Sequence, residues 1–484
     1  MADPLETIDI PPIDRLPDEG EELVHEKTIT ILEEYGIRID HEEARRILAE
    51  AGCDVDEETE IVTFPRDLVE GCVDDAPGSF TVRGRGSQPD QELGGDGHVV
   101  STAGGPPNVL TYEDGRRPST MEDFERFQKL VQMEEVITTA GNAICVPNGY
   151  DESIAPVEEQ KRILLMTDKL PGGNCYGEDR ARTAAEMVGI VHDDPDLSDY
   201  YLIGNANSVS PRTWDTKMAG GVLEHARMEQ PVILAPAVMA AASGPATLPG
   251  AMALANAEIL AGLTMAQLVN RGTPIIYGLP SSNVDVRYGS FSIGSPEGAL
   301  FVSFAGQMAR YYDVPARAGG GLTDAKTIDD QSGSEAMLQL LMTRFCGIDF
   351  ISHGAGILDS YSTASPEKFV LDCDRIRYLQ RFEEGYTLDE ESFAMDLIAE
   401  VEPADHFLNK RHTLEHSRDE FLIPELSYRD SYDNWEEEGS KDAFQRAHER
   451  VQDLVEEYER PPIDADIERD LERYVEVKRD EILG

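Results

Sequence analysis

Residues 316–361 read ARAGGGLTDAKTIDDQSGSEAMLQLLMTRFCGIDFISHGAGILDSY, and this stretch decides the fold. It begins with a Gly-rich turn that carries Asp324 and Lys326. A helix-length segment follows, and then a short apolar strand, Ile348–Ser352, that leads directly into His353. Strand, polar loop, helix and strand form the repeating unit of a parallel sheet. Because functional groups collect at the carboxyl ends of such strands, the stretch predicts a site as well as a fold.

The same pattern recurs upstream, with strand centres 29 to 42 residues apart. Open doubly wound sheets usually have fewer and less regular units, so the repeat predicts an α/β fold of the (β/α)8 TIM barrel type. The eighth strand is not obvious, and the sequence places it either around Val370 or before Met121. The seven evident strands are centred near Thr138, Asn174, Ile203, Leu234, Ile276, Ala316 and Phe350.

The chain of 484 residues is longer than a plain barrel of about 250 residues, so additional domains are expected. In the N-terminal part, Asp40 and Glu43 form a capping-box pattern at the start of a helix. The predicted organisation is an N-terminal α+β extension over residues 1–118, a (β/α)8 catalytic barrel over 119–385 and a C-terminal helical region over 386–484.

The charge of the chain is strongly acidic. Ninety-four Asp and Glu residues against 42 Lys and Arg residues give a net charge of −52, and only ten of the basic residues are lysines. A Debye length of about 3 Å at 1 M salt would remove most of the resulting self-repulsion. We therefore expect a cytoplasmic protein of an organism with molar internal salt, such as a halophilic archaeon. Nucleic-acid binding is not expected, because it requires a basic face.

Cysteine spacing and hydropathy bear on the compartment. The six cysteines lie far apart without a CxxC pair, which indicates small core residues in a reducing compartment. The N-terminal residues MADPLETIDIPP contain neither a basic stretch nor an apolar run, so secretion is not expected. The weakly charged stretch Ala246–Asn270 contains Glu258 and Gln267, and we interpret it as a buried barrel helix rather than a membrane span.

Six segments of the chain resemble one protein family, the trimethylamine:corrinoid methyltransferase (MttB) superfamily, and together they extend over nearly the whole chain. They are GGPPNVL at 104–110, LPGAMALANAEILAGLTMAQLVNRGTPIIYG at 248–278, SPEGAL at 295–300, GGGLTDAKTIDDQSGSEA at 319–336, HGAGILD at 353–359 and HTLEHSRDE at 412–420.

The resemblance implies a barrel enzyme that moves a methyl group from a small methylated amine to the Co(I) of a separate, cognate corrinoid protein. The corrinoid would thus be supplied in trans, with no tightly bound cofactor in this chain. Methanogen trimethylamine enzymes of the family carry pyrrolysine near the segment that aligns with Gly319–Lys326, whereas this chain is written entirely in standard residues. It therefore resembles the non-pyrrolysine members, which include glycine betaine demethylases.

The chemistry favours a quaternary amine as the methyl donor. Trimethylamine is a poor electrophile until its nitrogen is quaternised, a task that pyrrolysine could serve. A quaternary ammonium already has a neutral leaving group, so its enzyme needs only to position and desolvate the substrate. The alternatives are a trimethylamine:corrinoid methyltransferase proper and a non-catalytic barrel that binds betaine-type solutes.

The candidate site residues follow the predicted barrel strands. A pocket for a quaternary amine requires aromatic faces or carboxylates for the cation and a donor for any substrate carboxylate. We expect no metal ligands, a homo-oligomer and no membrane association. The expected catalytic residues are Asp324 and His353, and the expected substrate-binding residues are Tyr277, Asp285, Arg287 and Lys326.

Each of these residues also has a plainer interpretation. Asp285 and Arg287 are alternatively partners of each other only, and Asp324 is alternatively a cap for the helix that begins near Asp329. Lys326 as a Schiff-base lysine would instead indicate an aldolase-like barrel. The spacing of His406, His412 and His416 would also permit a zinc site, although no cysteine accompanies it.

Overall fold

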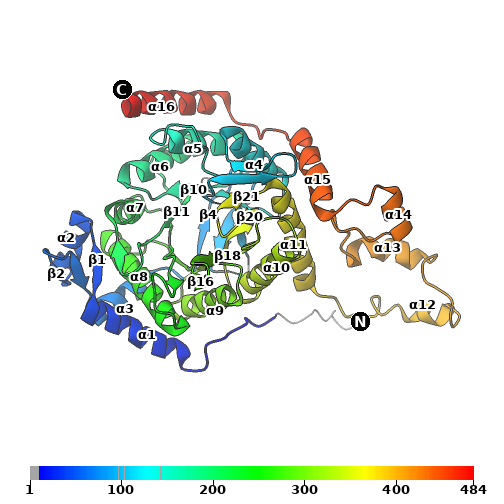
Figure 1. Cartoon of the computed structure of the whole chain (residues 1–484), viewed down its shortest axis with the longest axis horizontal. Helices are drawn as coiled ribbons and strands as arrows, with labels where there is room; N and C mark the ends of the chain where they lie inside the picture. The colour runs from blue at the N-terminus through cyan, green and yellow to red at the C-terminus, as the bar shows by residue number, and fades with distance from the viewer. Residues whose placement is uncertain (1–9, 96, 103, 142–143) are drawn as a thin grey trace.

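The structure is a computed structural model that describes residues 10–95, 97–102, 104–141 and 144–484. Its centre is a closed barrel of parallel strands, as the strand repeat predicts (Figure 1). All seven evident strands are present in it. In the order in which they pair around the barrel, the strands are β10 (Leu170–Asn174), β11 (Ile203–Ala206), β13 (Val232–Leu234), β15 (Ile275–Gly278), β18 (Ala316–Gly319), β19 (Phe350–Ala355), β6 (Val99–Thr102) and β9 (Thr139–Gly141).

The eighth strand is β6, which pairs with β19 on one side and β9 on the other. The alternative before Met121 is therefore confirmed, and Val370 lies in a helix instead. The expected boundary at residue 118 is wrong, because the barrel already begins at Val99 inside the predicted extension. Strand β6 has the sequence VVST, and all four of its residues are buried. No helix-length segment stands directly before it, so the spacing of the strand–helix repeat does not predict it.

Helices cover the outside of the barrel (Figure 1). Helix α8 (Leu248–Val269) is long and apolar enough to cross a membrane, yet 89% of its apolar window is buried inside the protein. This is the buried barrel helix that the sequence predicts. The helices that follow the barrel strands are α4 (Met121–Met133), α5 (Ala155–Met166), α6 (Glu178–His192), α7 (Thr216–Arg227), α8 (Leu248–Val269), α9 (Pro296–Tyr311), α10 (Asp330–Phe345) and α11 (Pro366–Glu384).

The N-terminal residues form a layer outside the barrel, where α1 and α3 pack against α8. The second helix is capped by His41, whose Nδ1 accepts from the Ala44 N–H, and not by the predicted Asp40. The elements of this layer are α1 (Gly20–Thr30), the π-helix η1 (Ile31–Tyr35), β1 (Ile37–Ile39), α2 (Glu42–Glu50), β2 (Asp54–Asp56), β3 (Ile61–Thr63) and α3 (Arg66–Asp75), with β12 (Thr213–Trp214) as the fourth strand of its sheet.

A hairpin closes the amino-terminal end of the barrel. Strands β4 (Phe80–Val82) and β5 (Gln91–Leu93) pair antiparallel, and their apolar side chains join the core cluster inside the barrel. Because this end is filled with apolar side chains, space for a ligand is left at the opposite, carboxyl end. The barrel residues of this cluster include Val99, Leu170, Ile203, Ile233, Ile276 and Phe350.

Two small sheets stand at the carboxyl end of the barrel and extend its wall. One has the order β20 (Ile357–Leu358), β21 (Thr363–Ala364), β7 (Asn108–Thr111) and β8 (Gly115–Pro118). The other has the order β14 (Met239–Ala240), β16 (Ser282–Asp285) and β17 (Ser290–Ser292). Both belong to loops that follow barrel strands, which is where a TIM barrel places its functional side chains.

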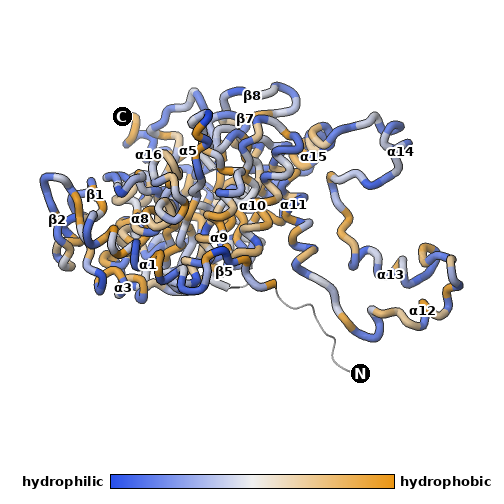
Figure 2. The backbone as a smooth tube through the Cα atoms, turned by 60° about the horizontal axis from the view of Figure 1, so that its bottom comes forward, coloured by the Kyte–Doolittle hydropathy of each residue, from blue (hydrophilic) through white to orange (hydrophobic). Residues whose placement is uncertain are grey.

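The chain after α11 leaves the body of the molecule as an arm, residues 386–440, and then returns (Figure 2). The arm contains α12 (Met395–Glu400), α13 (Arg411–Glu420) and α14 (Tyr432–Glu437), none of which has a buried residue. The last two helices lie on the barrel: α15 (Ala443–Glu457) packs against α11 and α4, and α16 (Ala465–Leu483) packs against α5 and α6. The helices predicted after residue 386 are therefore present, and only the last two lie against the barrel.

Candidate active site

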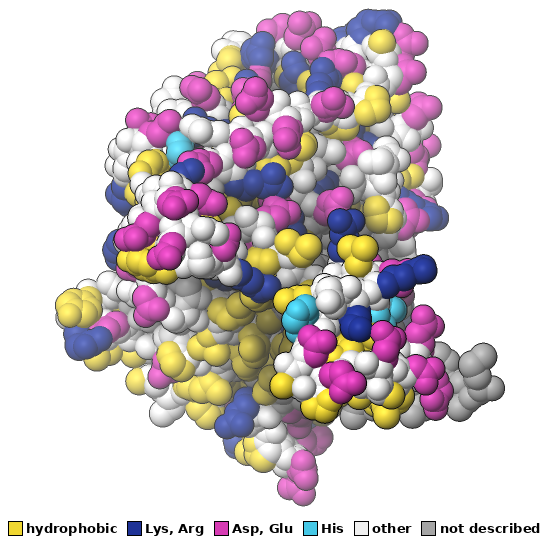
Figure 3. All heavy atoms as spheres, turned by 90° about the vertical axis from the view of Figure 1, so that its right-hand side faces the viewer, with side chains coloured by type: hydrophobic (Ala, Val, Ile, Leu, Met, Phe, Trp, Pro, Cys, Tyr) yellow, Lys and Arg dark blue, Asp and Glu magenta, His cyan; other side chains and the backbone are white. Residues whose placement is uncertain are grey.

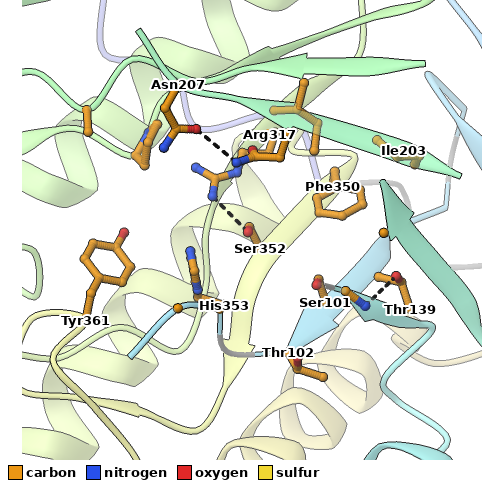
Figure 4. A pocket seen from close by; sticks show the side chains of 18 of the residues that line it. Ser101, Thr102, Thr139, Ile203, Asn207, Arg317, Phe350, Ser352, His353 and Tyr361 are labelled. Atoms are coloured by element: carbon orange, nitrogen blue, oxygen red, sulfur yellow. Dashed lines mark hydrogen bonds between the residues drawn. The ribbon is translucent and has the colours of Figure 1, made fainter. Parts of the chain in front are cut away.

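A cavity of about 560 Å³ occupies the carboxyl end of the barrel (Figure 4). Its floor is apolar and comes from side chains of the inner core cluster, including Ile203, Ile233 and Phe350. Its upper wall comes from the loops that follow the strands. The polar and aromatic side chains that line it are Ser101, Thr102, Thr139, Asn205, Asn207, Phe291, Phe350, Arg317, Ser352, His353 and Tyr361.

Arg317 is the charged side chain of this cavity, and it lies at the centre of Figure 4. It projects from β18 and is 3% exposed. Its Nη2 donates to the Ser352 hydroxyl at 2.9 Å, whereas Nε and Nη1 have no hydrogen-bond partner in the described part of the chain. Burial lowers the pKa of Arg317 to about 10, which leaves the guanidinium charged at neutral pH.

His353 lines the same cavity, at the end of β19. Its backbone is in the left-handed region, with φ of 51°, an unfavourable setting that residues at functional sites often hold. Burial, together with the charge of Arg317, lowers the pKa of His353 to about 3. The imidazole is therefore neutral at physiological pH, and its Nδ1 has no partner among the described residues.

Aromatic rings form one wall of the cavity. Tyr361 follows β19, and its ring stacks on Phe291 of β17 with centroids 6.2 Å apart. The same ring is 4.8 Å from the ring of His353. The Tyr361 hydroxyl has no hydrogen-bond partner among the described residues, and burial raises the pKa of this hydroxyl. Ring faces of this kind attract quaternary ammonium groups through cation–π interactions.

The structure keeps Asp324 out of this cavity. Its carboxylate accepts hydrogen bonds from the backbone N–H groups of Ile293 and Gly294, at 2.9 and 3.2 Å, and from the Ser360 hydroxyl at 2.6 Å. Burial raises the pKa of Asp324. It does not cap α10, because Asp329 does so itself. Asp324 thus joins two loops at the barrel mouth, one of which leads to Tyr361.

Tyr277 points away from the cavity, although it lies on barrel strand β15. It is 1% exposed, and its hydroxyl donates to the Asn256 Oδ1 of α8 at 2.9 Å. The Asn256 amide in turn donates to Thr28 and Tyr312. The structure therefore does not bring Tyr277 into the cavity, because neighbouring residues of a strand point to opposite faces, and Ile276 is the one that points into the barrel.

The remaining predicted residues are paired; Arg287 and Lys326 are exposed, and Asp285 is half-buried. Arg287 binds Asp285 through two nitrogens, with Nε–Oδ1 at 2.9 Å and Nη2–Oδ2 at 2.5 Å. Lys326 pairs with Asp359 at 2.6 Å and donates to the Asp324 carbonyl. None of these side chains lines the cavity, so the structure does not bring them into the site.

Sequence reasoning missed Arg317, although a signal for it exists. The segment VPARAGGG at 314–321 consists of apolar and small residues apart from this single charge. An arginine inside such a strand has no solvent to point to and must face either a partner or a site. Asn205 within β11 and Asn207 directly after it carry a similar signal, and Asn205 donates to the Asn207 side chain at 2.9 Å.

The chemistry open to this cavity is limited by its residues. Its described lining includes one guanidinium, neutral polar groups and aromatic rings, but no carboxylate. In the described ranges there is no group of three or more His, Cys, Asp or Glu side chains that could hold a metal ion. His412 and His416 do stack on α13, with ring centroids 4.2 Å apart, but this pair belongs to the arm and not to the cavity.

The chain is similar to known methyltransferases. Residues 3–483 match the family described as trimethylamine methyltransferase (MTTB). The chain is 36% identical over 475 residues to the glycine betaine methyltransferase of Desulfitobacterium hafniense (strain Y51), covering 98% of both chains. It is 29% identical over 463 residues to the trimethylamine methyltransferase MttB of Methanosarcina barkeri, covering 94% of this chain and 92% of that protein.

A solved structure has the same fold. The Methanosarcina barkeri monomethylamine methyltransferase (MtmB) superposes with a TM-score of 0.52 at 11% identity, over 92% of this chain and 89% of that one. This likeness concerns the fold alone. The family model and the glycine betaine methyltransferase, in contrast, match almost the whole length of the chain. The protein therefore belongs to the trimethylamine methyltransferase family, and its barrel is that of a methyltransferase.

Proposed function

We propose that this protein moves a methyl group from a small quaternary amine, of which glycine betaine is the example, to the Co(I) of a separate corrinoid protein. In this transfer the cobalt electron pair attacks one N-methyl carbon in line. The C–N bond breaks, its electron pair stays on nitrogen, and a neutral tertiary amine leaves. Such a reaction requires positioning and desolvation of the substrate rather than proton transfer.

The observation that carries the proposal is the combination of an aromatic wall with a neutral His353. The rings of Tyr361 and Phe291 offer faces to an ammonium group. The pKa of His353 is lowered to about 3, so its imidazole is neutral at neutral pH and does not act as an acid toward a free amine. A substrate whose nitrogen is already quaternary needs no such proton. The similarity to a glycine betaine methyltransferase supports the same substrate class.

The position of the cavity supports an acceptor supplied by a partner protein. The cavity lies at the carboxyl end of the barrel, and its lining includes the glycines Gly104 and Gly105. Gly105 is exposed, so a bulky macrocycle can approach the backbone closely there. We propose that a cognate corrinoid protein docks over this mouth and brings the cobalt with it.

The cysteines and the net charge bear on the cellular setting of the enzyme. Six free, buried cysteines suit a reducing cytoplasm, and the net charge of −52 suits molar salt. The arm, residues 386–440, exposes large apolar side chains such as Leu408 (82%) and Leu414 (71%), and hydrophobic side chains gather around it in Figure 3. We propose that a second copy of the chain covers them in a homo-oligomer, which the molecular mass in solution would show.

The direct test mixes the enzyme with a Co(I)-corrinoid partner protein and a panel of amines in molar KCl, and follows the cobalt spectrum. We expect methylation of cobalt with glycine betaine or a relative such as carnitine or proline betaine. Turnover of trimethylamine alone would overturn the substrate class and leave a trimethylamine methyltransferase. Tight binding of betaine without any methylation of cobalt would indicate a non-catalytic betaine-binding barrel.

A further inference from the structure

We infer that Arg317 is the anchor for a carboxylate of the substrate, so that the substrates of this site are quaternary amines that also carry a carboxylate. Choline and other quaternary amines without an anionic group would then be excluded. This inference rests on the proposed function for the ammonium end of the substrate, but it concerns a different group of the cavity and a different part of the ligand.

The first reason is the missing counter-ion of Arg317. A buried charge is costly unless it is paired and hydrogen-bonded. Arg117, which is more exposed than Arg317, has a carboxylate partner in Asp123 at 2.6 Å. Arg317 is 3% exposed, its one partner among the described residues is the neutral Ser352 hydroxyl, and none of the described residues that line the cavity carries a carboxylate. The complementary anion must therefore come with the ligand.

The second reason is the shape of the free donors. The contact with Ser352 holds Nη2 and thereby fixes the plane of the guanidinium, while Nε and Nη1 have no hydrogen-bond partner in the part of the chain that the structure describes. The N–H groups of Nε and Nη1 do not point the same way, so a carboxylate binds two parallel N–H groups when it uses one of these nitrogens together with the second N–H of Nη2. Such charge-assisted hydrogen bonds are about twice as strong as neutral ones. A hydroxyl group, as in choline, would leave the buried charge unpaired.

The third reason is the depth at which Arg317 lies. In the barrel it pairs in register with Gly278 on one side and with Phe350 of the apolar floor on the other. Tyr361 and Phe291 lie beyond the strand ends, in the loop and hairpin at the mouth. A substrate held by its carboxylate at Arg317 therefore directs its ammonium toward the rings. Its methyl groups then face the mouth, where an acceptor from outside must reach them.

The test measures binding only, by titration calorimetry in molar KCl, and needs no corrinoid. Three ligands separate the two ends of the substrate. Glycine betaine has both charges, 3,3-dimethylbutyrate has the same shape and carboxylate but a neutral carbon in place of nitrogen, and choline has the ammonium without the carboxylate. We expect betaine to bind most tightly, 3,3-dimethylbutyrate to bind measurably, and choline to bind at least about tenfold more weakly than betaine.

Substitutions of single arginines show which side chain binds the carboxylate of betaine. Arg317→Met keeps an apolar side chain of similar length in the cavity, and we expect it to weaken betaine binding by about 10- to 100-fold. Choline binding should change little. Arg287→Met is the matched control, since Arg287 is exposed and paired with Asp285, and it should bind betaine like the unmodified protein. If Arg317→Met does not fold, the comparison of ligands on the unmodified protein still decides the question.

Two results would overturn the inference: choline binding as tightly as betaine, or unchanged betaine affinity in folded Arg317→Met. These results are distinct from failure of the proposed function. Carboxylate-dependent binding without methylation of cobalt would leave the anchor standing and remove the methyl transfer. Equal methyl transfer from choline and betaine would leave the proposed methyl transfer standing and remove the carboxylate anchor.

Discussion

Tyr277 and Tyr361 show how the face on which a side chain stands decides its role. The hydroxyl of Tyr277 is part of a hydrogen-bond network with Asn256 behind the barrel, whereas the hydroxyl of Tyr361 has no partner among the described residues. Tyr277→Phe should therefore lower the free energy of unfolding by about 1–3 kcal/mol, because the Asn256 carbonyl loses its donor in a buried place. Methyl transfer should stay unchanged.

Tyr361→Phe is the matched variant, since it removes the same atom. It should change the free energy of unfolding by less than about 0.5 kcal/mol. Both values can be measured by denaturant unfolding. A large loss of activity in Tyr277→Phe without loss of stability would contradict this account and return Tyr277 to the site.

The pH dependence of substrate binding follows from His353 and Arg317. The pKa of His353 is lowered to about 3 and that of Arg317 to about 10, so neither group changes charge between pH 6 and 9. Calorimetry should thus find constant betaine affinity over that interval and weaker binding above pH 10. A decrease in affinity as the pH rises through about 6.5 would show instead that a protonated imidazole holds the substrate.

The lowered pKa of His353 also affects stability. The unfolded chain binds a proton near the ordinary histidine pKa of about 6.5, whereas the folded protein excludes that proton until about pH 3. The contribution of this residue to folding is therefore complete above about pH 6.5 and is lost progressively as the pH falls toward 3.

The sequence identifies some of these residues and not others for a physical reason. His353 stands directly after a recognisable strand, and a residue at the carboxyl end of a barrel strand faces the site. Arg317 and Tyr277 lie within strands that are buried on both faces. Hydropathy is the same on both faces of such a strand, so the pattern cannot tell which residues point inward.

At the scale of secondary-structure elements, Asp324 acts as a connection between the hairpin that carries Phe291 and the loop that carries Tyr361. Asp324→Asn would place an amide N–H group against backbone N–H groups of Ile293 or Gly294. We expect the free energy of unfolding to fall by about 1–3 kcal/mol. KM for betaine should rise because the aromatic wall is less well ordered, while kcat stays within about twofold.

Asp285→Asn is the control, because Asp285 is a carboxylate of the same end of the barrel that serves only Arg287 and its own turn. Its stability and kinetics should remain close to those of the unmodified protein. If Asp324→Asn abolishes kcat and keeps full stability, then Asp324 takes part in the reaction, as the sequence first suggests.

The strands and helices of the barrel were predictable because each repeat has its own hydrophobic pattern and turn residues. Strand β6 has only four residues and follows a hairpin that closes the barrel, so nothing local marks it as part of the repeat. The arm was predicted as helical, but its departure from the body depends on contacts that no local pattern records.

For the whole molecule, the net charge of −52 governs stability. At 0.1 M salt the Debye length is about 10 Å, so like charges that lie within that distance of one another on the acidic surface still repel. The melting temperature should therefore be higher in 2 M KCl than in 0.1 M KCl, and NaCl should act like KCl because screening depends on ionic strength. Calorimetric melting at equal pH checks this, and an unchanged melting temperature would contradict it.

The central claim, transfer of a methyl group from a quaternary amine with a carboxylate to cobalt, is tested most directly by the stoichiometry of a single turnover. The enzyme, an excess of Co(I)-corrinoid protein and a limiting amount of glycine betaine are combined in molar KCl, and both products are counted. The account predicts one dimethylglycine, measured by mass spectrometry, for each methylated cobalt, measured from its spectrum. It would be contradicted if betaine remained intact while trimethylamine methylated the cobalt under the same conditions.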